Sequence, residues 1–462
     1  MTDLGLTAFV LGLLALGLRR PFIWVLAYLY VDILAPQKIS WFLLASIPIS
    51  LIVFCLAFGG WLLVDDKRDS RFTFRQGLMI VLLVYCGATT LAADFPVEAA
   101  EKWGWVWKAM VFSIFLPLTL RTRLRFEASI LVMVMSIGAI VIGGSIKTLA
   151  SGGGYGTLKL FVNDNTGIYE GSIISCMSIA AIPLIWWLAQ HTTIFPRGKL
   201  TRLFAVALTF ACMLIPIGTQ ARTGLLCLVL LFLLSLRSVK NRFLYIGVMG
   251  VLAIVAIPFL PESYTKRMDT IENHHADESA STRVAVWMWT LDYVKDNPFG
   301  GGFDAFRSNR LRIETRSVST AGGNTMAIEV QQVEDAGRAY HSSYFEMLGE
   351  QGWPGLFLWL WIQALGIWHM ERLRSRWLKK ARAPGAGPEV KWQAPLANAL
   401  QQAHLVYMLG SLFVGIAFQA FILMLIGIQC GLWSYLRRID SPDRPAVRTR
   451  RKLNIPGAVA AN

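Results

Sequence analysis

Arg222, Arg283 and His341 stand near points where polar segments meet apolar runs, and their chemistry suits a phosphate-bearing substrate. Arg222 opens an apolar run between Gly218 and Gly224, small residues that allow close approach of neighbouring chain. The planar fork of an arginine binds a phosphate or pyrophosphate through two parallel hydrogen bonds. A histidine titrates near pH 7 and can take a proton from an attacking hydroxyl. His341 is therefore a candidate general base.

Arg283 begins a helical stretch, next to Ser281 and Thr282, which could cap that helix. A cation is disfavoured at a helix N-terminus, so an anionic partner would explain its position. Structural interpretations stay open for all three side chains. Arg222 could reach toward lipid phosphate, Arg283 could be a surface or ion-paired residue, and His341 could be a capping residue.

Glu346 and Glu350 follow the histidine within RAYHSSYFEMLGEQGWPG, residues 338–355. Either carboxylate could orient His341 or pack structurally. If residues 341–353 form a helix, Tyr344, Phe345 and Leu348 share the face of His341, and the two glutamates lie on other faces.

The elements that position these residues are apolar helices. The chain has 462 residues, is 55% hydrophobic and has a mean hydropathy of +0.50. Many stretches are uncharged and long enough for a helix to cross about 30 Å of hydrocarbon. The sequence therefore predicts an all-α polytopic integral membrane protein. The predicted spans lie near 4–18, 21–34, 41–64, 76–93, 104–120, 125–147, 166–189, 202–218, 222–236, 243–260, 342–368 and 397–437.

The last of these blocks, 397–437, decides the number of crossings. Both of its flanks are strongly basic, so both belong on the same side of a membrane. We therefore interpret it as two spans that turn near 418–421, which gives about 13 transmembrane helices. The first two spans are short, so 12 remains open.

The net charge of +15 is explained by where the cations lie. Basic clusters occupy every second interhelical segment, at 67–75, 121–125, 197–202, 237–242, 372–391 and 437–452. This pattern is typical of cytoplasmic loops under the positive-inside rule, and it requires no nucleic-acid partner.

Residues 261–341 form the one large extramembrane segment, which we assign to the periplasm. Its first 80 residues carry a net charge of −3, whereas the rest of the chain carries +18. A helix is predicted at 281–296, with Val284, Trp287 and Leu291 on its apolar face. The following DNPFGGGF predicts a turn. Residues 308–335 show no clear periodicity. The predicted division is a transmembrane bundle at 1–260, a periplasmic loop at 261–341, C-terminal helices at 342–437 and a basic cytoplasmic tail at 438–462.

Ionisable residues gather at the outer ends of the spans and are almost absent from their centres. This distribution suits a substrate with a lipid tail and a polar head, and it disfavours an ion or proton pathway. No internal repeat of the kind found in inverted-repeat transporters is visible. No set of residues has the spacing of a metal site, and no cofactor is expected.

Three motifs, in this order, resemble those of the O-antigen ligase and O-antigen polymerase superfamily. TQARTGLL resembles the family's arginine segment that opens a span. STRVAVWMWTLDYVKDNPFGGGFDAF resembles its arginine–tryptophan helix and glycine turn, and HSSYFEMLGEQGWPGL resembles its histidine motif. The N-terminal RRPFIWVLAYLYVDILAPQKISW looks closest to the O-glycosylation ligases associated with exosortase systems. Gln220-Ala221 replaces the usual serine before the arginine, and Ser342 stands where many relatives have asparagine.

The resemblance implies a metal-independent, inverting glycosyltransferase in the bacterial inner membrane with a periplasmic active site. Its donor would be an undecaprenyl-pyrophosphate-linked glycan, and its acceptor a hydroxyl on a glycan, lipid or protein. By the same resemblance, Arg222 and Arg283 would hold the pyrophosphate and His341 would be the base. Arg338 lies close to the histidine and could assist in binding.

Three other functions remain open. A polymerase of O-antigen or exopolysaccharide would use the same site as a ligase. A transporter of a lipid-linked glycan would require charges at mid-span or broken helices. A non-catalytic membrane partner would tolerate replacement of Arg222, Arg283 and His341.

Overall fold

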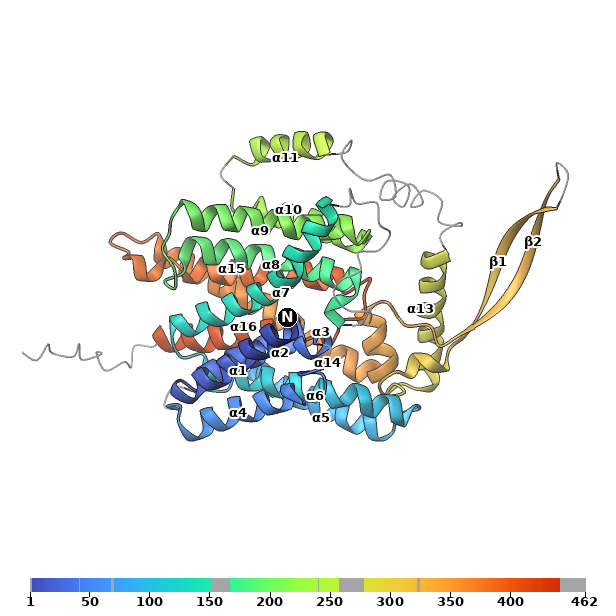
Figure 1. Cartoon of the computed structure of the whole chain (residues 1–462), viewed down its shortest axis with the longest axis horizontal. Coiled ribbons are helices and arrows are strands. Elements are labelled where there is room, and N and C mark those ends of the chain that lie inside the picture. The colour runs from blue at the N-terminus through green and yellow to red at the C-terminus, as the bar shows by residue number, and fades with distance from the viewer. Residues whose placement is uncertain are drawn as a thin grey trace, which may run out of the picture.

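The computed structural model describes residues 2–40, 42–67, 70–150, 167–239, 241–256, 278–321 and 325–440. In these parts of the chain most regular structure is helical, and the long helices lie side by side in one bundle (Figure 1). Among the helices of the described residues, five are long and apolar enough to cross a membrane: α5 (Phe74–Leu91), α7 (Arg123–Ala150), α8 (Gly171–His191), α9 (Lys199–Gly218) and α16 (Ala420–Ile439). The shorter apolar helices are α2 (Phe22–Leu34), α4 (Ile49–Leu63) and α10 (Arg222–Ser235). The bundle is completed by α1 (Thr2–Arg19), the short α3 (Pro36–Ile39), α6 (Pro96–Thr119), α14 (Ser343–Ala381) and α15 (Gln393–Gly410). The helix α11 (Arg242–Ala256) lies at the edge of the bundle, where Tyr245 stacks on Phe232 of α10 (Figure 1).

The predicted all-α polytopic fold is confirmed, and every predicted span corresponds to a helix. The last block contains two helices, α15 and α16, as its basic flanks indicated. The turn between them occupies 411–419, earlier than the predicted 418–421. Phe418 lies in this turn and Phe421 in the first turn of α16, and both side chains are buried against the protein.

The C-terminal helices pack among the N-terminal ones. α15 lies against α8, and α16 lies against α6. Small residues permit these contacts: a Cβ on Gly410 would lie 2.2 Å from the sulfur of Cys176. The domain boundaries predicted at 260 and 341 stay predictions. The tail predicted at 438–462 lies outside the described residues from position 441 onward.

The predicted helix in the large loop is confirmed as α13 (Glu278–Asp296), but its predicted apolar face is wrong in part. Val284 and Leu291 are exposed, while Trp287 does contact the bundle. The buried positions of the helix are Val286, Thr290 and Val294. The spacing of apolar residues correctly predicted a helix, but α13 packs on α14 through the face of Val286, Thr290 and Val294 and not through the predicted face.

The glycine-rich turn after α13 joins the loop to the bundle, and the predicted break is confirmed. Gly301 N–H donates to the carbonyl of Gly349 at 3.0 Å, and Gly302 N–H donates to that of Glu350 at 2.9 Å. Gly300 has a φ of 80°, and a Cβ there would lie 2.5 Å from the carbonyl oxygen of Glu350. α14 is itself kinked at Gly352, which has a φ of 62°. Two glycine backbones therefore meet where side chains would prevent the contact.

An antiparallel hairpin follows, formed by β1 (Arg310–Ala321) and β2 (Thr325–Ala336), with Arg310 opposite Ala336. The hairpin projects from the same end of the bundle as α13 (Figure 1). We call this end, which carries residues 278–341, the loop end. The strands were not predicted, because apolar and polar residues alternate only weakly along 308–335.

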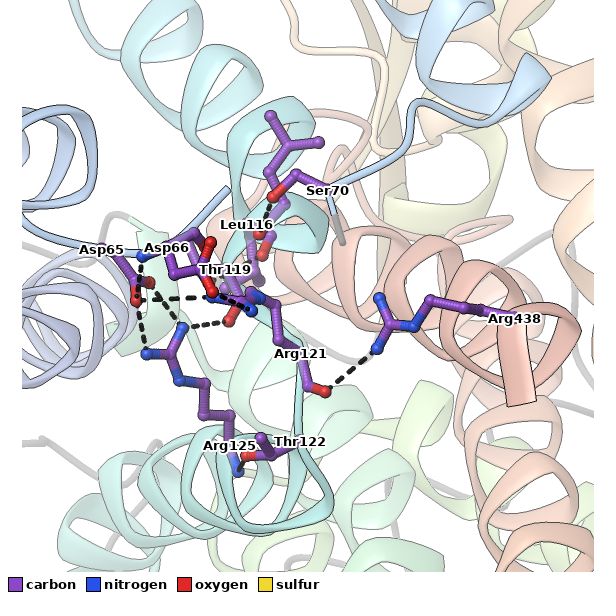
Figure 2. A network of polar contacts seen from close by, with 10 residues as sticks. Asp65, Asp66, Ser70, Leu116, Thr119, Arg121, Thr122, Arg125 and Arg438 are labelled. Atoms are coloured by element: carbon purple, nitrogen blue, oxygen red, sulfur yellow. Dashed lines mark hydrogen bonds and ion pairs between the residues drawn. The ribbon is translucent and has the colours of Figure 1, made fainter. Parts of the chain in front are cut away.

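Arginine–aspartate pairs tie together the helix termini at the opposite end of the bundle, which we call the basic end. Arg125 makes two bonds to the carboxylate of Asp65, at 2.6 and 2.8 Å (Figure 2). Arg121 pairs with Asp66 at 3.0 Å, and Arg438 donates to the carbonyl of Arg121 at 3.1 Å. The network joins the chain after α4 to the ends of α6 and α16 and the start of α7.

Candidate active site

The contact between α13 and the start of α14 positions the predicted histidine motif. The ring of Trp287 stacks on that of Phe345, with centroids 4.9 Å apart and 3° between the planes. The indole N–H of Trp287 donates to the carbonyl of Tyr340 at 2.9 Å. Tyr340 is buried with Val286 in a small apolar cluster. Because Arg283 lies one turn before Trp287, this contact brings it to His341.

His341 itself lies just outside the helix. α14 begins at Ser343, one residue after the predicted start of the span near 342, so His341 precedes the helix. His341 has a φ of 47°, in the left-handed region that is unfavourable for most side chains. Such a conformation costs of order 1–3 kcal/mol and persists where its surroundings enforce it.

Hydrogen bonds on both sides of His341 enforce this conformation. Ser343 N–H donates to the carbonyl of Ser411 at 2.8 Å. The Ser343 hydroxyl donates to the carbonyl of Val414 at 2.9 Å and accepts the N–H of Ile416 at 2.8 Å. The backbone of the histidine is thus held between α13 and the α15–α16 turn.

Partial burial of the His341 ring, and then the charges around it, lower the pKa of its imidazole. The side chain is accessible to solvent, but the protein around it lowers its pKa below the usual 6.5, and the positive charge of Arg283 adds to this shift. Arg338 acts in the same direction, and Glu170 opposes it. A neutral imidazole can accept a proton at pH 7. Arg283, Arg338 and Glu170 thus lie within electrostatic range of His341 and change the pKa of its imidazole.

Arg338 is exposed, and its backbone is clamped by one side chain. The amide of Asn309 accepts the N–H of Arg338 at 3.0 Å and donates to its carbonyl at 2.7 Å. This clamp fixes the chain that enters the histidine motif.

Glu170 connects the histidine to the Arg222 segment. It caps α8 by accepting the N–H groups of Ser172 and Ile173, at 3.2 and 2.9 Å. One turn into α8, the Ser175 hydroxyl lies 2.8 Å from that of Thr219. Arg222 is then the first residue of α10, which packs on α8. Nothing in the sequence singled out Glu170 as a neighbour of His341, because Glu170 caps α8, a helix far from the histidine motif in the sequence.

The backbone before Arg222 is strained as well. Gln220 has a φ of 53°, so among the described residues it joins His341 in a short set of non-glycine side chains with positive φ. The predicted close approach at Gly224 is confirmed: a Cβ there would lie 2.6 Å from the ring of Pro216. Strained backbone of this kind clusters at functional sites.

Glu346 and Glu350 do not orient the histidine; they bind Lys102 of α6. The Lys102 ammonium lies 2.8 Å from Glu346 and 2.7 Å from Glu350. Glu350 also accepts the N–H of Asp304 at 3.0 Å, and Glu346 accepts that of Ala417 at 3.2 Å. The structural interpretation of these carboxylates holds, and Lys102 is a partner that no local motif identified.

Within the described residues, no group of three or more His, Cys, Asp and Glu side chains is arranged to hold a metal ion. The polar groups at the loop end include Arg283 and Arg338, which act on His341, and a cluster of carboxylates around Lys102. This arrangement can bind an anion and accept a proton.

The helices and their lengths define a multi-pass membrane protein. Residues 203–360 match the family model described as O-antigen ligase, and this segment contains Arg222, Arg283, Arg338 and His341. The match identifies it as a domain of the O-antigen ligase superfamily and confirms the resemblance seen in the sequence. Residues 1–193 match a model described as a family of unknown function, DUF5935. A search of curated proteins finds no match to the chain. The association with exosortase systems stays a prediction.

The O-antigen ligase domain makes the protein a membrane enzyme of the glycan-transferring kind. Its donor and acceptor classes are, in general, a lipid-linked glycan and a glycan or lipid.

Proposed function

We propose that the protein is a metal-independent, inverting glycosyltransferase that moves a glycan from undecaprenyl pyrophosphate to an acceptor hydroxyl. The observation that carries the proposal is the packing of Trp287 on Phe345, which brings Arg283, one turn earlier in α13, within electrostatic range of His341. Both residues lie in the O-antigen ligase domain, at the loop end of a membrane bundle. We assign this end to the periplasmic face of the bacterial inner membrane, because the opposite end carries the basic clusters.

In the proposed reaction, the acceptor hydroxyl attacks the anomeric carbon on the face opposite the pyrophosphate. A new carbon–oxygen bond forms while the bond from that carbon to the phosphate oxygen breaks. The hydroxyl proton passes to His341, and the electron pair of the broken bond leaves with undecaprenyl pyrophosphate. Inversion follows from the single displacement.

Arg222 and Arg283 would bind the pyrophosphate and stabilise the charge that develops on it, and Arg338 would assist from the chain before the histidine. Fixed cations that face developing charge are effective because they need no reorganisation during the reaction. The preference for a ligase over a polymerase rests on the closest-branch resemblance of the N-terminal segment.

The test is glycan transfer by the purified protein in nanodiscs, with undecaprenyl-pyrophosphate glycan as donor and EDTA present. His341→Asn removes the base and keeps a residue that tolerates a left-handed backbone. We expect it to lower the rate by about 10²–10⁴-fold while the unfolding temperature stays unchanged. Arg222→Ala should lower the rate by about 10²–10³-fold.

Arg202→Ala is the matched control, because Arg202 is an exposed arginine in the first turn of α9 at the basic end. It should leave the rate unchanged. Folded His341 and Arg222 variants with wild-type rates would show that the site is wrong. Loss of wild-type activity in EDTA would refute metal independence.

A further inference from the structure

A cavity of about 600 Å³ lies at the basic end of the bundle, away from the candidate active site. It lies between the last turns of α14 and α16 and is lined by Arg372, Leu373, Ser375, Arg376, Lys379, Lys380, Trp433 and Arg437. From Gly352 to Lys379, α14 rises roughly 40 Å at 1.5 Å per residue. The cavity and His341 are therefore at opposite ends of one helix.

The cations of the cavity outnumber the carboxylates near them. Asp440 pairs with both Arg376 and Lys380. Among the described residues, no carboxylate lies within 4.0 Å of Arg372, Lys379 or Arg437. Positive charges that converge on one cavity repel each other unless an anion joins them.

Other cations at the same end have carboxylate partners in the protein. Arg125 binds Asp65, as Figure 2 shows, and Arg123 pairs with Glu127 at 2.7 Å. Glu371, on α14 itself, pairs with Arg374 at 2.8 Å. These carboxylates at the basic end pair with arginines outside the cavity, so the cavity lining keeps an excess of positive charge.

Aromatic rings lie under three of the cavity cations, one of which is Lys380, 4.7 Å from the ring centroid of Trp377. Arg372 lies over the ring of Trp368 at 4.9 Å, and Arg437 lies over that of Trp433 at 5.6 Å. Trp433 is stacked on His369, with ring centroids 3.9 Å apart. Trp368 is 49% exposed on the surface of the bundle. Aromatic rings of this kind lie at the level of lipid headgroups in membrane proteins.

We propose that this cavity binds the phosphate headgroup of an anionic phospholipid, with the acyl chains along the apolar surface beside Trp368. Arg372, Lys379 and Arg437 would bind the phosphate oxygens by charge-assisted hydrogen bonds. Basic pockets between transmembrane helices bind anionic headgroups in the same way. The cavity is within the range of about 300–1,000 Å³ that is usual for ligand sites.

The test measures lipid binding by native mass spectrometry of the full chain released from detergent. The probes are dioleoylphosphatidylglycerol, dioleoylphosphatidylcholine and, separately, inorganic phosphate. Wild type should prefer phosphatidylglycerol over phosphatidylcholine by about tenfold or more. The variant Arg372→Gln/Lys379→Gln/Arg437→Gln should lose this preference, and Arg372→Lys/Arg437→Lys should keep most of it because it keeps the charge.

A control variant, Lys199→Gln/Arg202→Gln/Arg242→Gln, removes the same charge from exposed first turns of α9 and α11. It should bind phosphatidylglycerol as wild type does. Equal losses in the control and cavity variants would show general attraction between cations and anionic lipid, and would overturn the proposal. Retained preference in the neutralised cavity variant would overturn it too. Binding of inorganic phosphate as tight as that of phosphatidylglycerol would indicate a site for a free anion and would overturn the assignment to a lipid.

Discussion

Trp287 of α13 stacks face to face on Phe345 of α14, with 3° between the ring planes, and this contact sets Arg283 beside His341. Trp287→Ala should lower glycan transfer by about 10–10²-fold, because small displacements of binding groups are costly in rate. Trp287→Phe keeps the ring contact and should retain most of the activity. Rates in the nanodisc assay check both. Trp105→Ala, at a half-exposed position of α6, is the control. An equal loss of rate in this variant would mean that the loss in Trp287→Ala does not come from displacement of Arg283.

The charges around His341 predict opposite shifts in the pH dependence of transfer. Arg283 lowers the pKa of His341, so Arg283→Gln should raise that pKa and move the acid limb of the pH–rate profile to higher pH. Glu170 raises the pKa, so Glu170→Gln should move the limb to lower pH. Activity requires neutral imidazole, and it is therefore lost as the pH falls through the pKa. Profiles of residual rate from pH 4.5 to 8 would detect the shifts, and movement of both variants in one direction would exclude His341 as the titrating base.

Lys102 should be a large contributor to stability. Its removal in Lys102→Met leaves the fully buried carboxylate of Glu350 without its cation. Breaking a buried pair in this way typically costs about 3–5 kcal/mol. Thermal unfolding in nanodiscs measures the loss, and Lys102→Met/Glu346→Gln/Glu350→Gln should recover part of it. Lys295→Met, which removes an exposed pair with Asp292, should not change the midpoint. An unchanged midpoint for Lys102→Met would mean that the cluster is not ionised as a unit.

The glycine turn should be intolerant of a single methyl group. Gly300→Ala places a Cβ 2.5 Å from the carbonyl oxygen of Glu350 and requires a left-handed backbone, which by itself costs about 1–2 kcal/mol. We expect a lower unfolding midpoint and a loss of transfer, because the turn attaches α13 to α14. Gly104→Ala in α6 is the matched control, since open space surrounds that position. It should stabilise the helix or leave it unchanged. A Gly300 variant as stable as the Gly104 variant would contradict the role of the turn.

The sequence by itself was sufficient for the membrane helices, the paired helices of 397–437, the helix of α13 and the turn after it. These features follow from local rules. An apolar stretch of span length must be helical in lipid, and glycines permit backbone that other residues resist. Arg222, Arg283 and His341 could be chosen as candidates because they lie within short motifs, and Arg338 because it is close to the histidine in the sequence; their roles stay predictions.

Tertiary structure decided which residues meet. Lys102 is 244 positions from Glu346 in the sequence. Glu170, at the start of α8, changes the pKa of His341, which precedes α14. The buried face of α13, the left-handed backbone of His341 and the hairpin of β1 and β2 were equally hidden. Each depends on partners that only folding brings within hydrogen-bonding or Coulomb distance, and the energy of those contacts is absent from any local pattern. The glutamates of the histidine motif show the difference most clearly: the sequence left open whether they orient His341 or pack structurally, and the fold places both against Lys102 of α6.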